Sequence, residues 1–456
     1  MTQPGFPTDK LGAEATELKS RHPERTRLKP AASINLAPLR QNQPPNRSRS
    51  PKGTRRDFVA LSADFQSRAG ATPAPVLRIL IVYDCLFPWT IGGAERWYRA
   101  LAERLAASGH QVTYVTLRQW EPGADPALPD VRVIAVGPEM ELYAGSKRRL
   151  WPPLRFGLGV LWHLLRHRHA YDVVHTASFP YWPLLAAAAV QPLGPYRLVV
   201  DWWEVWTRAY WRQYAGWPIG TIGWLVQRVC VRRTPRAFCF SRLHAQRLAD
   251  EGIRQPPSML HGIYGGPAEL VAPRSEPELM VLYAGRHIPE KRVPAIVPAI
   301  VAAREVLPEL RAVLTGDGLD RAQVRRLIDA AGLGEVISLP GFVDDERLDG
   351  LFRQALCCML PSRREGYGLV VVEAAARGTP SIVVRDPDNA ATELIEEGVN
   401  GVLAASASAA DLASAILRVY HAGPGLRRST ADWFTRNAER LSLAGSMARV
   451  SAIYRR

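Results

Sequence analysis

The 456-residue chain contains few of the groups that hold small or metal-dependent folds together. Its five cysteines, at positions 85, 230, 239, 357 and 358, lack the paired spacing of a metal site. No uninterrupted apolar run reaches the roughly 18 to 20 residues that cross a bilayer, and the first residues lack the basic and apolar segments of a secretory signal. We therefore expect a protein of the reducing cytoplasm, without a transmembrane span or a disulfide framework.

Lysine is also scarce, with six residues against 52 arginines. Residues 1–74 hold 13 basic and 6 acidic residues, residues 75–273 hold 22 and 14, and residues 274–456 hold 23 of each. Such clustering favours an anionic partner, either nucleic acid or an anionic membrane surface, although abundant arginine, alanine, glycine and proline are also typical of a GC-rich genome. Because no nucleic-acid-reading motif is present, we expect no nucleic-acid partner.

Residues 1–74 differ in composition from the rest of the chain. They are rich in proline, arginine, serine, threonine and glutamine, and no apolar period is sustained over a helix or a strand. Such a segment cannot bury enough apolar surface to offset its chain entropy, which predicts a disordered basic leader. A start codon assigned too far upstream would explain the same composition.

Apolar runs alternate with helix-length segments after residue 75, which predicts parallel sheets. A strand over 76–83, a helix over 94–108 and a strand over 112–117 form one β-α-β unit. Further strand candidates are 131–136, 173–175 and 198–201, then, after a polar break at 265–278, 280–284, 311–315, 336–339, 355–360, 381–384 and 401–403.

This order predicts an α/β protein of two doubly wound, Rossmann-like domains that face each other across a cleft. We expect an N-terminal domain over 75–270 and a C-terminal domain over 271–430. A C-terminal helix over 431–456 is expected to pack back towards the N-terminal domain.

The first chemical motif contains two glutamates, Glu365 and Glu373, around a glycine turn. The turn, Gly366-Tyr367-Gly368-Leu369, lies between a predicted strand and a predicted helix. Its glycines allow the backbone to approach a ligand closely, and the helix N-terminus favours an anionic phosphate. Carboxylates at these positions could accept hydrogen bonds from sugar and ribose hydroxyls, or Glu365 could simply charge the helix start.

The second motif is Gly285-Arg286, with Lys291 five residues after the arginine, directly behind the predicted strand 280–284. Two fixed cations at a strand exit can stabilise the charge that grows on a leaving diphosphate. A third glycine turn, Gly92-Gly93, follows the first strand. It does not have the spacing of a dinucleotide fingerprint.

Together these motifs resemble the retaining GT-B glycosyltransferases of glycosyltransferase family 4, over about residues 78–420. The hallmark is a glutamate, seven residues and a second glutamate, as in Glu365 and Glu373. The other matching pieces are Gly92 to Glu95, Gly285-Arg286 with Lys291, Thr315 to Gly318, Leu339 to Val343, Pro361-Ser362, Gly378 to Pro380 and Asn400-Gly401.

The resemblance implies sugar transfer from a UDP- or GDP-sugar with retained anomeric configuration, without a cofactor or a metal. It also implies that the domain over 75–270 binds the acceptor and that the domain over 271–430 binds the nucleotide sugar. It makes Arg286 and Lys291 the diphosphate ligands, Glu373 the ribose ligand and Glu365 the partner of the donor sugar. The expected donor-binding residues are Gly92, Gly93, Gly285, Gly366, Tyr367, Gly368, Leu369 and Glu373, and the expected catalytic residues are Glu365, Arg286, Lys291 and Glu204.

Glu204 is on that list because a histidine is missing. Many relatives end the strand that corresponds to 198–201 with Thr-x-His, whose histidine contacts the donor sugar, whereas this chain has Asp201, Trp202 and Trp203, followed by Glu204. Either Asp201 or Glu204 supplies that contact, or the donor phosphate acts as its own base. His261, where relatives usually have asparagine, is expected to cap a loop.

Other functions of the same fold remain as alternatives. These are a sugar-nucleotide epimerase, a glycogen-type phosphorylase, and a catalytically silent module that binds a nucleotide sugar or a partner protein. A phosphorylase would need a cofactor lysine, and Lys291 is the only lysine after residue 147. Asp386-Pro387-Asp388 has the form of a metal motif but falls in a loop that varies within the family.

The acceptor side is predicted from residues 147–169, in which Lys147, Arg148 and Arg149 precede an aromatic and leucine-rich stretch and more basic residues follow. Such a helix suits an anionic bilayer, although a core-facing helix with solvated ends has the same pattern. Nine of the 13 tryptophans lie between 151 and 224. We therefore expect a saccharide or lipid-linked acceptor of the cell envelope, and a protein that is cytoplasmic or peripheral on the inner face of the membrane.

Overall fold

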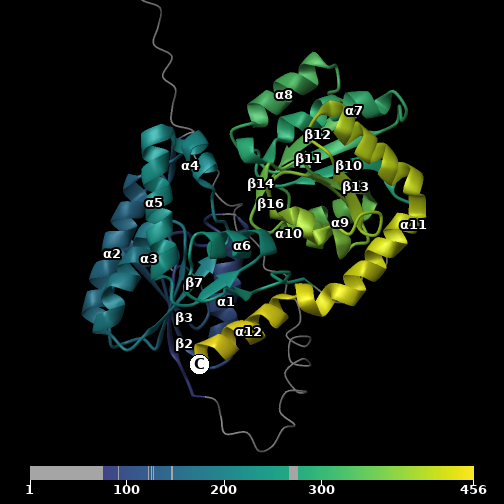
Figure 1. Ribbon diagram of the computed structural model, residues 1–456. Coiled ribbons are helices and arrows are strands. Elements are labelled where there is room, and N and C mark those ends of the chain that lie inside the picture. Colours follow the sequence, from purple (N-terminus) through teal and green to yellow (C-terminus); the bar gives the residue numbers. More distant parts are fainter. Residues whose placement is uncertain are drawn as a thin grey trace, which may run out of the picture. The chain divides into compact units, whose positions relative to one another are not determined.

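The computed structural model describes residues 75–455 except 91, 122, 125, 127, 145, 146 and 267–275, and of residues 143, 144 and 147 it describes the backbone only. The expected leader, residues 1–74, and the expected domain boundary at 270/271 lie outside the described residues. The described residues form two parallel sheets with helices on both faces (Figure 1).

The first sheet has seven strands in the order β3-β2-β1-β6-β7-β8-β9, and every pairing is parallel. In that order the strands are β3 (Val131–Gly137), β2 (Gln111–Leu117), β1 (Arg78–Val82), β6 (Val173–Ala177), β7 (Arg197–Trp202), β8 (Ala237–Cys239) and β9 (Ser258–Met259). Its helices are α1 (Gly93–Ala107), α2 (Trp151–His167), α3 (Tyr181–Val190), α4 (Arg208–Ala215), α5 (Trp217–Arg233) and α6 (Arg242–Asp250).

Alternate residues of β1 point to opposite faces, and both faces are covered. Ile79 and Ile81 pack in one apolar cluster with α1, whereas Leu80 and Val82 pack in another with α2, α3 and α5. Burial on both faces explains why β1 is a continuous apolar run rather than an alternating one.

The second sheet has six strands in the order β12-β11-β10-β13-β15-β17, again all parallel. They are β12 (Ile337–Gly341), β11 (Arg311–Thr315), β10 (Glu278–Ala284), β13 (Ala355–Leu360), β15 (Ser381–Val384) and β17 (Gly401–Ala404). The helices of this sheet are α7 (Ile296–Arg304), α8 (Arg321–Ala330), α9 (Asp345–Gln354), α10 (Leu369–Ala375) and α11 (Ala409–Leu441).

The second sheet is covered in the same way, with Val281 and Tyr283 packed towards α7, α8 and α11. Met280 and Leu282 pack towards α9 and α10 on the other face. In both sheets the order of strands reverses beside the first strand, between β1 and β6 and between β10 and β13. Ligands of doubly wound sheets bind outside the carboxyl ends of the strands at this reversal.

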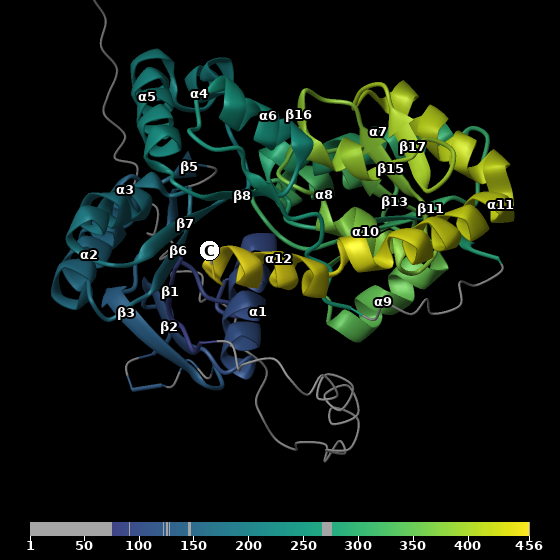
Figure 2. The same ribbon diagram turned by 60° about the horizontal axis from the view of Figure 1, so that its bottom comes forward.

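Helix α11 crosses from one sheet to the other because it bends at Gly423-Pro424, where Gly423 has a φ of 59°. Before the bend Ile416 and Val419 pack on the second sheet, and after it Phe434 joins the cluster of the first sheet. Helix α12 (Leu443–Arg455) continues along the first sheet (Figure 2), where Tyr454 Oη lies 2.5 Å from Nδ1 of buried His175.

The remaining elements are short. They are β4 (Tyr143–Ala144), β5 (Lys147–Arg148), β14 (Arg364–Glu365) and β16 (Asp388–Asn389), with 3₁₀ turns at Gln191–Leu193, Pro289–Lys291, Val293–Ala295 and Ala390–Leu394. No helix among the described residues combines the length and the hydropathy needed to cross a bilayer.

Candidate active site

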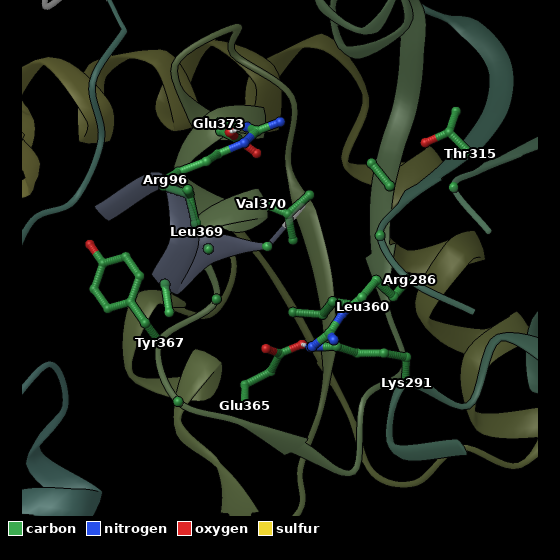
Figure 3. A pocket seen from close by; sticks show the side chains of 18 of the residues that line it. Arg96, Arg286, Lys291, Thr315, Leu360, Glu365, Tyr367, Leu369, Val370 and Glu373 are labelled. Carbon is green, nitrogen blue, oxygen red and sulfur yellow. Dashed lines mark hydrogen bonds and ion pairs between the residues drawn. The ribbon is translucent and has the colours of Figure 1, made fainter. Parts of the chain in front are cut away.

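A cavity of about 360 Å³ lies where the strand ends of both sheets meet, and all twelve residues predicted from the sequence line it. Gly92, Gly93 and Glu204 come from the first sheet and its connections. Those from the second sheet are Gly285, Arg286, Lys291, Glu365, Gly366, Tyr367, Gly368, Leu369 and Glu373. Figure 3 shows Arg286, Lys291 and Glu365 gathered on one side of the cavity and Glu373 on another.

Lys291 and Ser362 hold the side chain of Glu365 at the centre of this group. Lys291 Nζ lies 2.5 Å from Glu365 Oε1, and the hydroxyl of buried Ser362 donates to the same oxygen at 2.8 Å. Among the described residues Oε2 has no hydrogen-bond partner. A buried carboxylate is stable only when it is paired, so Lys291 and Ser362 fix one oxygen and leave the other able to accept from a ligand hydroxyl.

The glycines of the turn are required by close packing. Gly368 has a φ of 98°, and a Cβ atom there would lie 2.5 Å from Cβ of Ala391. A Cβ atom on Gly366 would lie 2.8 Å from the carbonyl oxygen of Trp203, on the connection that follows β7. The turn therefore brings backbone of the second sheet into contact with the segment that carries Glu204.

Glu373, on α10, faces Arg96, on α1. Arg96 Nη1 lies 3.6 Å from Glu373 Oε1. Burial raises the pKa of Glu373, and Arg96 and Arg377 offset only part of this rise. Arg96 was not among the predicted site residues, although its place one turn into the helix after Gly92-Gly93 is visible in the sequence.

Only one of the two acidic substitutes for the missing histidine reaches the cavity. Asp201 is buried at the end of β7, where its oxygens accept from Nε1 of Trp97 at 2.7 Å and contact Nε2 of His175 at 2.8 Å. Glu204 lines the cavity. Asp201 thus belongs to the core of the first sheet, and Glu204 is the acidic residue available to a ligand.

Arg364 and Trp206 hold the carboxylate of Glu204. Arg364 Nε lies 3.0 Å from Glu204 Oε2, and Trp206 Nε1 donates to the same oxygen at 2.7 Å. Burial alone would raise the pKa of Glu204, but Arg364, His244, the Trp206 hydrogen bond and Lys291 together outweigh it. The pKa of Glu204 therefore lies below its usual value. No local sequence pattern marks Arg364, because its partner Glu204 follows a strand of the other sheet.

Several residues outside the cavity have structural contacts. Asp386 pairs with Arg292 at 3.1 Å and Asp388 with Arg247 at 2.6 Å, so both acids of the metal-like motif face arginines. Asp344 caps α9 by accepting from the amide of Arg347, as expected for a helix start. The backbone carbonyl of His261 accepts from the Tyr367 hydroxyl at 2.7 Å.

Comparison with known families agrees with this geometry. The model of Glycosyltransferase Family 4 matches residues 91–265, and that of Glycosyl transferases group 1 matches residues 271–439. The chain belongs to the family 4 glycosyltransferases. The two matches contain every strand of the two sheets except β1, and together they contain all twelve residues of the cavity that the sequence predicted.

Known relatives of this glycosyltransferase act on different compounds. A glycogen synthase of Mycobacterium tuberculosis is 29% identical over 380 residues, which are 75% of this chain and 86% of that protein. An alpha-D-kanosaminyltransferase of Streptomyces kanamyceticus is 29% identical over 177 residues. That match covers 39% of this chain and spans only 45% of the kanosaminyltransferase.

Solved structures support the GT-B fold. A sucrose-phosphate synthase from Thermosynechococcus elongatus superposes with a TM-score of 0.68 at 20% identity, over 83% of this chain and 98% of that one. Anabaena HepE, solved in complex with UDP and glucose, superposes with a TM-score of 0.62 at 17% identity, over 83% of this chain and 99% of that one. These likenesses confirm the predicted fold of two Rossmann-like domains.

Proposed function

We propose that this glycosyltransferase moves a hexosyl group from a UDP- or GDP-sugar to a saccharide or lipid-linked acceptor of the cell envelope, with retention of the anomeric configuration. One observation carries the donor part of the proposal. Arg286, Lys291, Glu365 and Glu373 come from separate segments of the second sheet and line one cavity.

The charges of the cavity suit a nucleoside diphosphate sugar. Arg286 and Lys291 supply positive charge for the diphosphate. A ribose hydroxyl can donate to Glu373, and a sugar hydroxyl can donate to the second oxygen of Glu365. Anabaena HepE, a protein of the same fold, binds UDP and glucose.

The proposed step exchanges one bond at the anomeric carbon. The acceptor hydroxyl oxygen forms a bond to this carbon while the bond from the carbon to the diphosphate oxygen breaks. The electron pair of the broken bond stays on the diphosphate, where Arg286 and Lys291 stabilise it. The acceptor proton passes to a diphosphate oxygen on the same face of the sugar, which gives retention. This step uses no cofactor and no metal.

Glu204 takes the place of the missing histidine in this proposal. Arg364 and Trp206 keep its carboxylate ionised and fixed at the edge of the cavity. An ionised carboxylate can accept a hydrogen bond from a donor-sugar hydroxyl, a role that a neutral imidazole nitrogen can also fill.

A thermal-shift screen over UDP-, GDP- and ADP-sugars tests the donor, because a ligand that binds only the native state raises the apparent stability. A hydrolysis assay with and without acceptor then separates the alternatives. A transferase releases nucleoside diphosphate, an epimerase returns an altered nucleotide sugar, and a silent module binds without turnover. Proton magnetic resonance of the product reads the anomeric configuration, and an inverted product would refute retention.

A further inference from the structure

The outer face of α5 is apolar and exposed. Trp217 is 70% exposed, Ile222 60%, Leu225 49% and Val229 48%. Ile222, Leu225 and Val229 are three or four residues apart and so form a stripe along one side of the helix. No charged residue occurs between 217 and 227. Single exposed apolar residues are ordinary, but a continuous stripe on a helix marks an interaction surface.

Helix α2 presents a second apolar stripe. Its core side carries Phe156, Val160 and Leu164, which are fully buried, whereas Trp151 and Trp162 are 59% and 63% exposed. Helix α3 packs against both α2 and α5, and Figures 1 and 2 show the three helices side by side on one face of the first sheet. Of the 19 large apolar side chains exposed among the described residues, 12 lie between residues 150 and 229.

The charged side chains of the four helices of this face, α2, α3, α4 and α5, are all positive. Helices α2, α3, α4 and α5 together contain seven arginines and neither aspartate nor glutamate. Helices of the second sheet such as α8 and α9 mix acidic and basic residues. Arg232 and Arg233 are exposed at the end of the α5 stripe, and among the described residues neither has an acidic partner.

The basic cluster at 147–149 does not form the exposed cationic patch for a membrane that its sequence suggests. Arg148 forms an ion pair with Asp84, a fully buried residue just after β1, and its own side chain is only 10% exposed. Arg149 pairs with Glu141 at 2.8 Å. The side chain of Lys147 lies outside what the structure describes. The electrostatic part of the surface must therefore come from the helices.

We propose that the outer face of α2, α3, α4 and α5 binds the surface of an anionic phospholipid bilayer, with the apolar stripe of α5 inserted between the headgroups. Apolar burial and attraction of arginine to acidic lipid act together on such a helix layer. Its complete lack of carboxylates favours this partner over an ordinary protein surface, which carries both signs of charge.

This docking would bring the cavity to the membrane. Helix α5 follows α4 after one residue. The side of α4 opposite to the proposed membrane face lies towards the second sheet, where the Arg364 guanidinium is 4.7 Å from the ring centre of Tyr210. Arg363 also donates to Gln213 of α4 at 2.6 Å. The inference thus deepens the proposed function by favouring a lipid-linked acceptor.

Vesicle sedimentation of the full chain tests the proposal without turnover. We expect binding to phosphatidylcholine vesicles that contain phosphatidylglycerol, and little binding to phosphatidylcholine alone. Salt should weaken binding as the Debye length falls from about 10 Å at 0.1 M to about 3 Å at 1 M. Arg232→Ser with Arg233→Ser should weaken it about 30-fold, since each arginine near an anionic surface contributes about 1 kcal/mol.

Ile222→Glu with Leu225→Glu should reduce binding to the level of neutral vesicles. Both side chains are exposed, so the fold should survive, as the donor-induced thermal shift would show. Val301→Glu with Val306→Glu is the matched control, because these residues are 44% and 56% exposed on the second domain. This control should bind vesicles like the wild type.

Equal binding of the wild type and the α5 variants would overturn the proposal, as would equal binding to neutral vesicles. If the chain instead forms a dimer that the α5 substitutions dissociate, the face is an interface between copies and the membrane proposal is wrong. Failure to bind vesicles would leave the donor chemistry untouched, and failure of the donor assay would leave the vesicle result untouched.

Discussion

Replacing Arg364 by methionine would remove the cation that controls Glu204. Besides its contact with Glu204, the guanidinium lies 4.3 Å from the ring centre of Trp206, and the Arg364 side chain is only 13% exposed. Methionine can keep the packing on the aromatic rings while it removes the charge. The variant therefore isolates the electrostatic contribution of Arg364.

Breaking one side of a buried ion pair costs about 3–5 kcal/mol. The Glu204 side chain is 27% exposed, and water on the cavity side screens its charge. We therefore expect the lower end, a loss of about 3 kcal/mol or less in the free energy of unfolding.

The pH dependence follows from the sign of the pKa shift. In the wild type the pKa of Glu204 is lowered, so the stabilisation from the pair is present above the ordinary carboxyl pKa and is lost as the pH falls through the lowered value. Arg364→Met removes the positive charge that does most to lower this pKa, so burial raises the pKa of Glu204. Glu204 then becomes protonated at a higher pH than in the wild type.

Calorimetric titration with the accepted nucleotide sugar, from neutral to mildly acidic pH, would measure this difference. We expect donor affinity to decline more steeply with falling pH in Arg364→Met than in the wild type, since the raised pKa of Glu373 affects both proteins alike. Arg363→Met is the matched control, since Arg363 contacts Gln213 and Tyr210 of α4 and not Glu204. Arg364→Lys should restore most of the wild-type profile. Identical profiles for Arg364→Met and the wild type would refute the assigned contact.

Three further predictions concern other residues. Arg286→Ala, Lys291→Ala and Glu373→Ala should each weaken donor binding about 10- to 100-fold in calorimetry, since a hydrogen bond to a charged group contributes about 1.5–3 kcal/mol; unchanged affinity in all three would contradict the donor site. Asp201→Asn should lower the melting temperature without changing donor affinity, because both oxygens of Asp201 are engaged in the core; an affinity loss at full stability would count against Glu204 as the ligand. Removal of residues 1–74 should leave activity and melting temperature unchanged, and a clear drop in melting temperature would show that this segment contributes to the fold.

The sequence predicts the strands that are buried on both faces. The expected strands 311–315, 355–360 and 381–384 coincide with β11, β13 and β15, because a continuous apolar run between polar turns is typical of a central parallel strand. Strands β8 and β9 were missed, since they contain three and two residues. A segment that short has no period to detect.

The predicted site residues are those that follow a strand or begin a helix, since doubly wound folds bind ligands there. Arg96, Arg364 and Arg148 show the limit of this reasoning. Each pairs with an acidic residue that is distant in sequence, and no local pattern distinguishes such an arginine from a solvated one. For Arg148 the prediction of an exposed membrane contact was wrong. Its guanidinium pairs with Asp84, a buried residue just after β1, and is therefore itself largely buried.

The contacts between the two domains differ in strength, and this difference bears on how a donor enters. Away from the cavity, Glu393 accepts from the amides of Arg242 and Leu243 at the start of α6, at 2.8 and 2.7 Å. Within the cavity, Arg96 and Glu373 are 3.6 Å apart with side chains 43% and 22% exposed, and a pair so exposed contributes about 0–1 kcal/mol. In the proposed donor complex, a ribose at Glu373 therefore has to displace only this weak pair, while the contacts at α6 can keep the two domains together.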